Sequence, residues 1–224
     1  MGGRARGDLN VWWRVGIVVV GAVARIFFRL RATGTEHVPA SGPAILAGNH
    51  VSSLDGIALG LVTGERARRM TRFLAAAEFF AKPQFRWALR LYRQIPLHRG
   101  AGDEDALGEA IRTIRRGALA GIFPEGRVNP DPDVLQRGRS GLARLAIPTG
   151  APVVPVGIWG TQHRWPRAGL HAHRPWRPTI VVAYGPPLDP GVDGLSANAV
   201  LMFTDRVMHA IAHQVQIART MAEG

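Results

Sequence analysis

The sequence contains no cysteine among its 224 residues. Disulfide bonds, thiolate zinc sites and cysteine nucleophiles are therefore excluded within it, which fits a reducing compartment. Lysine is nearly absent as well, because Lys82 is the only one and arginine supplies the rest of the basic residues. The formal net charge is +12. A basic protein favours anionic partners, such as nucleic acid, anionic lipid or phosphorylated substrates.

The N-terminal segment lacks a hydrophobic run long enough to cross a bilayer. Its uncharged apolar run, residues 15–24, is ten residues long, whereas a membrane-spanning helix needs about 20. Arg14, Arg25 and Arg29 fall on one stripe of a helical wheel around this run. We therefore interpret residues 1–33 as a segment whose helix lies in the headgroup region of a membrane.

Two other interpretations of this segment stay open. The helix could belong to the protein core, with its arginines extending to solvent, or it could be a signal peptide, because residues 22–24 resemble a cleavage site. A second basic amphipathic segment spans residues 82–94 and places Arg86, Arg90 and Arg93 on one helical stripe. That segment is also compatible with an ordinary solvated helix face.

The remaining residues, 34–224, have the composition and pattern of one α/β domain. Hydrophobic residues make up 46% of the chain, which argues against disorder. Strand and helix patterns alternate with short links, which predicts a central, mostly parallel or mixed β-sheet flanked by helices. Strands are expected at 44–48, 94–99, 118–123, 152–160 and 176–188, helices at 53–63, 103–117, 140–150 and 196–218, and either type at 72–78.

The stretch AILAGNHVSSLDG, residues 44–56, places His50 and Asp55 five residues apart. On one continuous helix these side chains would point about 140° apart. The spacing suits a turn in which His50 follows a strand and Asp55 opens a helix, so that the carboxylate reaches the imidazole. Such a carboxylate fixes the tautomer and makes the other ring nitrogen a better base for a hydroxyl substrate. The alternative is a capping aspartate beside a structural histidine.

No strong protein nucleophile accompanies this pair. The G-x-S-x-G motif is absent from the sequence, and Ser52 and Ser53 are explained more simply as helix caps. We therefore expect a substrate hydroxyl to attack directly, without a covalent enzyme intermediate. His171 and His173 form a His-x-His pair with no nearby acidic residue, so we expect no metal site.

Several arginines lie where an α/β sheet binds ligands, beyond the ends of predicted strands. Arg127 ends the tight loop FPEGR, residues 123–127, and Arg99 follows another strand. Arg137 and Arg139 precede a predicted helix N-terminus, which itself favours anions. Guanidinium groups suit phosphate, although each arginine alone could be a solvated surface charge.

Five blocks of the chain, taken in order, resemble the 1-acylglycerol-3-phosphate acyltransferase family of phospholipid synthesis. The resemblance extends from about residue 34 to residue 188. The blocks are NHVSSLD (49–55), IPLHR (95–99), FPEGR (123–127), QRGRSGLARLA (136–146) and VVPVGIWGT (153–161).

The resemblance implies transfer of an acyl chain from acyl-CoA or acyl carrier protein to the free hydroxyl of 1-acylglycerol-3-phosphate, which yields phosphatidate without a cofactor. His50 would be the base, Asp55 would orient it, and Val153 to Ile158 would shape the acyl side of the site. The acceptor phosphate would be held by Arg99, Glu125, Gly126 and Arg127, with Arg137 and Arg139 as further anion contacts.

One departure from the family pattern leaves the acceptor open. Arg127 follows Gly126 directly, where many members have a threonine between the glycine and the arginine. The acceptor could therefore be another lysophospholipid or a lyso-aminolipid. A non-enzymatic protein that binds anionic lipid is the remaining alternative, whereas no nucleic-acid motif is present. We expect a peripheral or monotopic protein on the cytoplasmic face of the cell membrane.

Overall fold

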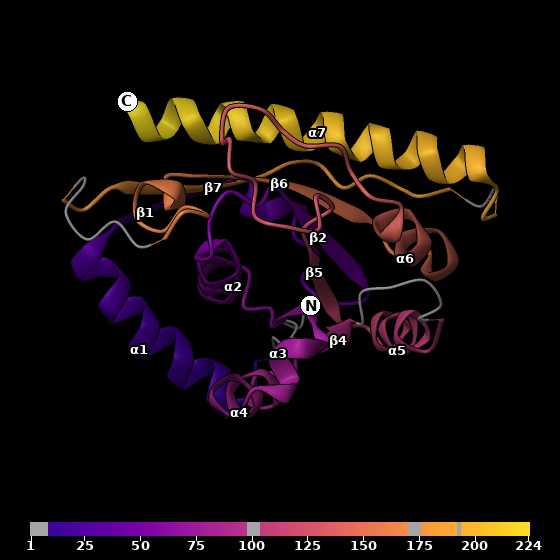
Figure 1. Cartoon of the computed structure of the whole chain (residues 1–224), viewed down its shortest axis with the longest axis horizontal. Helices are drawn as coiled ribbons and strands as arrows, with labels where there is room; N and C mark the ends of the chain where they lie inside the picture. Colours follow the sequence, from indigo (N-terminus) through magenta and orange to yellow (C-terminus); the bar gives the residue numbers. More distant parts are fainter. Residues whose placement is uncertain (1–8, 98–103, 170–175, 192–193) are drawn as a thin grey trace, which may run out of the picture.

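The computed structural model describes residues 9–97, 104–169, 176–191 and 194–224 (Figure 1). Within these ranges the chain forms one seven-stranded sheet, in the order β1-β7-β6-β2-β5-β3-β4. The strands are β1 (Arg29–Thr33), β2 (Ala44–Gly48), β3 (Thr71–Ala76), β4 (Ile95–Leu97), β5 (Leu119–Ile122), β6 (Val153–Trp159) and β7 (Thr179–Tyr184). Neighbouring strands are parallel except for β6 and β7, which pair in the antiparallel sense.

Helices cover both faces of this sheet (Figure 1). They are α1 (Val11–Phe27), α2 (Asp55–Arg66), α3 (Ala77–Ala81), α4 (Pro83–Leu91), α5 (Glu104–Arg115), α6 (Gly141–Thr149) and α7 (Ala197–Glu223), with 3-10 turns η1 (Thr35–His37) and η2 (Thr161–His163). The expected α/β architecture with a mixed, helix-flanked sheet is therefore confirmed.

The central strand β2 shows why the sheet is buried on both faces. All five of its residues are buried, as expected for an uninterrupted apolar run at the centre of a parallel sheet. Ile45 and Ala47 join a core with residues of α5, α6 and α7. Ala44 and Leu46 point to the other face and join a core with α2. Because β2, β5 and β6 are parallel, the loops that follow them meet at one edge of the sheet.

The structure settles two local details of the chain. The segment 72–78 was ambiguous, and it forms the end of β3 and the start of α3. The helix expected at 140–150 is α6, which contains Pro148 and ends at Gly150 in the left-handed conformation with φ of 62°. A proline so close to a helix end interrupts little of the hydrogen-bond ladder, and a glycine is the usual residue for such a C-terminus.

The N-terminal segment also differs from the expectation of a helical unit over residues 1–33. Its last residues form β1, which pairs in parallel with β7 from Arg29↔Thr179 to Thr33↔Ala183. The sheet therefore begins before the predicted domain boundary at residue 34. A five-residue edge strand whose exposed and half-buried residues alternate gives little signal beside a strong helical pattern.

Helix α1 packs on α2 through small residues and one tryptophan. Trp13 and Gly21 are buried against α2, Gly16 is buried against Tyr92, and Arg25 donates to Glu65 of α2 at 2.9 Å. The arginine stripe inferred from the sequence is thus divided, since Arg29 lies in β1 and not on the helix. The outer face of α1 is apolar, and its exposed members are Val11, Trp12, Val15, Val18, Val19, Val20, Val23, Ile26 and Phe27. No helix within the described residues is both long enough and apolar enough to cross a membrane.

Candidate active site

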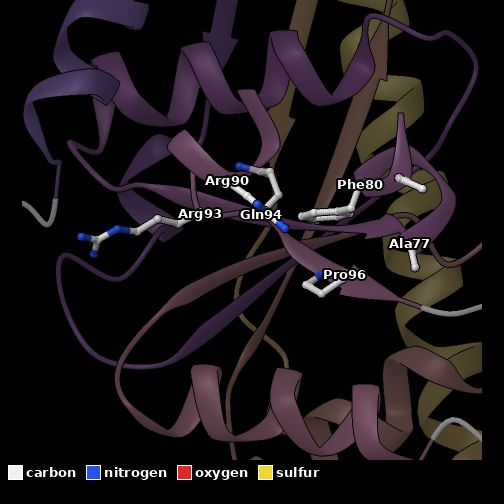
Figure 2. Close-up of a pocket in the computed structure, with 7 residues that line it drawn as sticks. Ala77, Phe80, Arg90, Arg93, Gln94 and Pro96 are labelled. Atoms are coloured by element: carbon white, nitrogen blue, oxygen red, sulfur yellow. The ribbon is translucent and has the colours of Figure 1, made fainter. Parts of the chain in front are cut away.

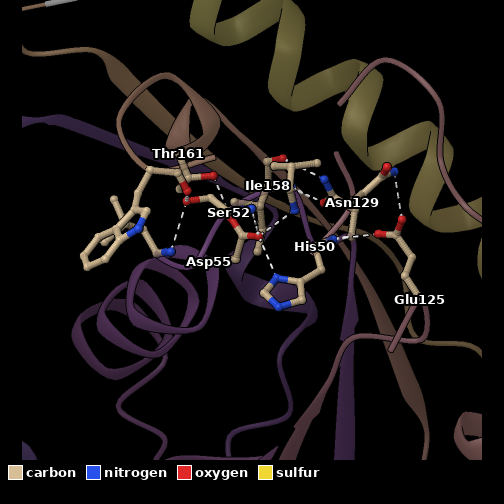
Figure 3. A network of polar contacts seen from close by, with 11 residues as sticks. His50, Ser52, Asp55, Glu125, Asn129, Ile158 and Thr161 are labelled. Atoms are coloured by element: carbon tan, nitrogen blue, oxygen red, sulfur yellow. Dashed lines mark hydrogen bonds and ion pairs between the residues drawn. The ribbon is translucent and has the colours of Figure 1, made fainter. Parts of the chain in front are cut away.

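His50 and Asp55 meet in the turn that joins β2 to α2 (Figure 3). His50 follows the strand by two residues, and Asp55 is the first residue of the helix. The imidazole Nδ1 lies 2.9 Å from Asp55 Oδ2. The geometry expected from the five-residue spacing is therefore present. A carboxylate partner on Nδ1 assigns the ring proton to that nitrogen and leaves Nε2 with its lone pair.

The Asp55 carboxylate is completely buried, so its charge depends on protein donors. Oδ2 also accepts the backbone N–H groups of Val51 at 2.7 Å and Ser52 at 2.8 Å. Oδ1 accepts the hydroxyl of Thr161 at 2.6 Å. The His50 side chain keeps 20% of its surface exposed. The pair thus combines a fixed, dry carboxylate with an imidazole that solvent or a substrate can reach.

Aromatic rings set the plane of the imidazole. Phe123, the residue after β5, stacks on His50 with ring centroids 4.2 Å apart and an interplanar angle of 12°. Phe73 of β3 stacks in turn on Phe123 at 5.9 Å. A stacked ring face also favours a cation, and hence the protonated imidazole that forms when His50 takes a proton. Phe123 begins the FPEGR loop, and no pattern in the sequence predicts this role for it.

Glu125 supports the backbone of His50 from inside the protein. Its Oε1 accepts the His50 N–H at 2.7 Å, and its Oε2 accepts Asn129 Nδ2 at 3.0 Å and Gln136 N at 3.1 Å. The backbone N–H of Asn129 donates to the His50 carbonyl at 2.6 Å. The NH and the carbonyl of His50 are therefore both held by the loop after β5.

This placement corrects the expectation that Glu125 contacts the acceptor phosphate. The residue is only 2% exposed, and its carboxylate faces the backbone donors just described. Burial raises the pKa of the Glu125 carboxyl above its ordinary value, while hydrogen bonds from His50, Gln136 and Asn129 oppose that rise. A buried carboxylate also repels a phosphate, so we regard Glu125 as a support for the His50 turn.

The arginines of the same loop reach the surface. Arg127, Arg137 and Arg139 are all exposed. Arg127 Nε donates to Gln136 Oε1 at 3.1 Å, and Arg139 Nε donates to the Glu125 carbonyl at 3.2 Å. Gly126 has φ of +73°, and a Cβ there would lie 2.7 Å from Arg139 Nε. Gly126 thus permits the turn and the close approach of Arg139. Arg99 lies outside the described residues.

A match to a family model identifies the family of the chain. The model described as acyltransferase matches residues 29–159, which is more than half of the chain and runs from β1 to the end of β6. The chain belongs to the acyltransferase family. The match includes the His50–Asp55 turn and the Glu125 loop, so both are parts of the acyltransferase domain.

Two relatives support this membership. The chain is 30% identical to the chloroplastic 1-acyl-sn-glycerol-3-phosphate acyltransferase BAT2 of Brassica napus, over 60% of this chain and 38% of that protein. It is 29% identical to the N-acylphosphatidylethanolamine synthase of Arabidopsis thaliana, over 73% of this chain and 62% of that protein. The chain therefore spans less than two thirds of the length of these relatives.

The fold of this acyltransferase also matches a solved structure. The crystal structure of the 1-acyl-sn-glycerophosphate (LPA) acyltransferase PlsC from Thermotoga maritima aligns with a TM-score of 0.69. The alignment covers 90% of this chain and 78% of that chain at 24% identity. This likeness supports the single mixed-sheet α/β fold.

Serine and strand residues near the pair have structural contacts in this acyltransferase. Ser52 is buried, donates to the Trp165 carbonyl at 2.6 Å and accepts the Leu54 N–H at 3.0 Å, which fits a turn-capping residue better than a nucleophile. The segment Val153–Ile158, expected to shape the acyl side, is buried throughout in β6. Its side chains belong to the two cores on either face of the sheet.

A cavity of about 530 Å³ is lined by residues of α3, the end of α4 and β4 (Figure 2). It is lined by Ala77, Phe80, Ala81, Arg90, Arg93, Gln94 and Pro96. Gln94 connects it to the site, because Gln94 Oε1 accepts the N–H of Phe73, whose ring begins the stack onto His50. In Figure 2 the Arg93 side chain points away from Phe80 and Pro96.

The residues that the structure describes offer no set of ligands for a metal ion. Among these residues no group of three or more His, Cys, Asp or Glu side chains is placed to hold an ion. His171 and His173 lie outside the described residues.

Proposed function

We propose that the protein transfers a fatty acyl chain from an acyl thioester to the free hydroxyl of 1-acylglycerol-3-phosphate, which makes phosphatidate. The observation that carries this proposal is the His50–Asp55 pair, whose Nδ1–Oδ2 distance is 2.9 Å and whose imidazole is partly open to solvent. The exposed arginines of the adjacent loop suit an acceptor with a phosphate group. The donor is acyl-CoA or acyl carrier protein, and no cofactor is needed.

In the proposed mechanism, His50 Nε2 accepts the proton of the acceptor hydroxyl as that oxygen attacks the thioester carbonyl carbon. Nδ1–H stays bonded to Asp55, whose negative charge stabilises the imidazolium that forms. The tetrahedral intermediate then collapses, the C–S bond breaks, and His50 returns the proton to the leaving sulfur. The products are the new ester and a free thiol, and the histidine is neutral again.

The acceptor phosphate is proposed to bind at Arg127 and Arg139, with Arg99 and Arg137 as further contacts. Support comes from the loop geometry, since Arg139 Nε bonds the carbonyl of Glu125 while the Glu125 carboxylate holds the His50 N–H. Arg139 is therefore bonded to the same residue that holds the His50 backbone. Arg127 and Arg139 each donate from Nε, the guanidinium nitrogen nearest the chain, and this geometry suits an outer fork directed at a phosphate.

We further propose that the protein binds the cytoplasmic face of the membrane through α1. The support is the apolar outer face of this helix, on which Val19 is 56% exposed. Val19→Glu should reduce flotation of the full chain with vesicles that contain phosphatidylglycerol. Met202→Glu is the matched control, because Met202 of α7 is 64% exposed on a different helix. Equal flotation of both variants and the unchanged protein would contradict the assignment of α1.

The experiment that tests the reaction is a panel of lyso acceptors, each supplied with labelled acyl-CoA and with labelled acyl carrier protein. Lysophosphatidate should be the preferred acceptor, and His50→Ala should abolish its acylation while vesicle binding persists. Equal rates for acceptors with and without a terminal phosphate would refute the proposed acceptor. Transfer that survives in His50→Ala would refute the proposed base.

A second candidate is a sister reaction on another lysophospholipid or a lyso-aminolipid. It is favoured by the similarity to a protein named N-acylphosphatidylethanolamine synthase, which extends over 73% of this chain. The position of Arg127 directly after Gly126 points the same way, because this loop is the proposed headgroup contact. The acceptor panel separates the two candidates.

A further inference from the structure

Thr161 makes a hydrogen bond that reaches the back of the His50–Asp55 pair (Figure 3). Its hydroxyl donates to Asp55 Oδ1 at 2.6 Å, and both residues are 0% exposed. Within the described part of the chain, Oδ2 accepts three N–H groups, whereas Oδ1 accepts this hydroxyl. The Thr161 hydroxyl therefore satisfies the half of the carboxylate that faces away from the histidine.

Thr161 reaches this position because β6 runs parallel to β2. It opens η2 directly after Gly160, whose φ of +99° and close approach to the Thr179 carbonyl require a glycine. The turn after β6 also bonds the turn after β2 through Trp165. Trp165 N donates to the Thr161 carbonyl at 3.1 Å, and the Trp165 carbonyl accepts both Ser52 Oγ and Ser53 N. The turn after β6 and the turn after β2 are thus fastened together.

We propose that Thr161 is a positioning residue for the acyl transfer, acting on His50 through Asp55. This inference rests on the proposed function. A buried carboxylate oxygen without a donor is costly, so loss of the hydroxyl would let Asp55 turn or share its Oδ2 donors. Each of these changes weakens the bond from Asp55 to His50 Nδ1–H.

The effect should fall on the chemical step. His50 is neutral when the substrates bind and carries a positive charge when it has taken the hydroxyl proton. Asp55 therefore interacts more strongly with His50 in the transition state than in the bound ground state. A defect in Asp55 placement should lower kcat and leave the acceptor KM nearly unchanged.

Thr63 provides a matched control inside the same domain. Its side chain is also 0% exposed, and its hydroxyl bonds the Leu59 carbonyl at 2.7 Å and the Tyr184 hydroxyl at 2.8 Å. Thr63 and Asp55 are on the same helix, α2, but Thr63 has no bond to the pair. Thr63→Val and Thr161→Val each remove one buried hydroxyl with little change in shape, so general destabilisation should affect both variants alike.

The first test compares the steady-state kinetics of the full chain with those of Thr161→Val, Thr161→Ser and Thr63→Val. We expect kcat of Thr161→Val to fall by roughly 10-fold to 100-fold, with KM within about twofold, because hydrogen bonds to charged groups contribute in that range. Thr161→Ser should restore most of the rate, and Thr63→Val should keep it. A loss in Thr161→Val no larger than in Thr63→Val overturns the proposal. If Thr161→Val does not fold, Thr161→Ala replaces it.

The second test needs no turnover. The Nδ1–H proton of His50 should give a downfield proton NMR signal, which is assigned by its disappearance in His50→Gln. Thr161→Val should shift or broaden this signal, whereas Thr63→Val should leave it in place. An unchanged signal in Thr161→Val refutes the positioning role even if acyl transfer is confirmed. A shifted signal in a protein without acyl transfer would refute the proposed reaction and retain the coupling of Thr161 to His50.

Discussion

Replacement of Asp55 by asparagine isolates the charge of the carboxylate from its geometry. The donors around it fix how an asparagine would sit, because Val51 N, Ser52 N and His50 Nδ1 all point at the Oδ2 position. An amide oxygen fits there, whereas an amide NH₂ would face three N–H groups. The amide nitrogen then lies opposite Thr161, whose hydroxyl can accept as well as donate. The fold and the His50 tautomer should therefore survive.

The expected fall in kcat follows from the loss of the negative charge of Asp55. Two unit charges about 4 Å apart attract by about 4 kcal/mol at an effective dielectric constant near 20. The amide dipole retains part of this attraction, so the imidazolium in the transition state should lose about 3 kcal/mol. At 1.36 kcal/mol per tenfold, kcat should fall roughly 10²-fold to 10³-fold. The acceptor KM should change little, because His50 is neutral when the acceptor binds.

The assay is acyl transfer from labelled acyl-CoA under saturating acceptor, with thermal unfolding measured on the same samples. Asp133→Asn is the control, since Asp133 is an exposed carboxylate paired with Arg219 of α7. Asp55→Asn should fold like the unchanged protein and turn over far more slowly. A kcat within about tenfold of the control, or a defect confined to KM, would refute the electrostatic role of Asp55.

Two further changes test the loop after β5. The raised pKa of Glu125 means that the folded chain holds this proton more tightly than the unfolded chain, so the free energy of unfolding falls as pH rises above the ordinary value of 4.5. Glu125→Gln should flatten this fall in urea unfolding followed by pH, and an unchanged slope would contradict it. Arg127→Ala should raise the acceptor KM severalfold with kcat retained. Arg144→Ala, on the exposed side of α6, is the control and should keep both constants. Equal kinetics for the two variants would show that Arg127 does not bind the acceptor phosphate.

Much of this architecture could be predicted from the sequence because its strongest signals are local. The uninterrupted apolar run of β2 and the acidic-to-basic gradient of α5 predict their own structure. The His50–Asp55 contact was also predictable, because five residues are too few for any path except a turn. Each of these features depends on residues close together in the chain.

The features that escaped prediction depend on distant partners or on side-chain direction. Thr161 is 106 residues from its hydrogen-bond partner Asp55 in the chain, and no local sequence pattern predicts that contact. Glu125 and Arg127 are neighbours in one tight loop, yet one is buried and the other exposed. Sequence spacing predicts a bend there but not which side chain turns inward. The short strand β1 was hidden for a related reason, since its partner β7 is about 150 residues away.

The join between α1 and β1 has a mechanical consequence. Phe28 alone separates the last residue of the helix from the first residue of the strand, and its N–H still bonds the Ala24 carbonyl. A single connecting residue leaves little freedom for the helix to move relative to the strand. The Arg25–Glu65 ion pair also joins α1 to α2. Wherever the helix docks, the sheet must follow at a fixed tilt and height. If α1 binds a membrane as proposed, the distance from His50 to that membrane is therefore fixed by the fold of the domain.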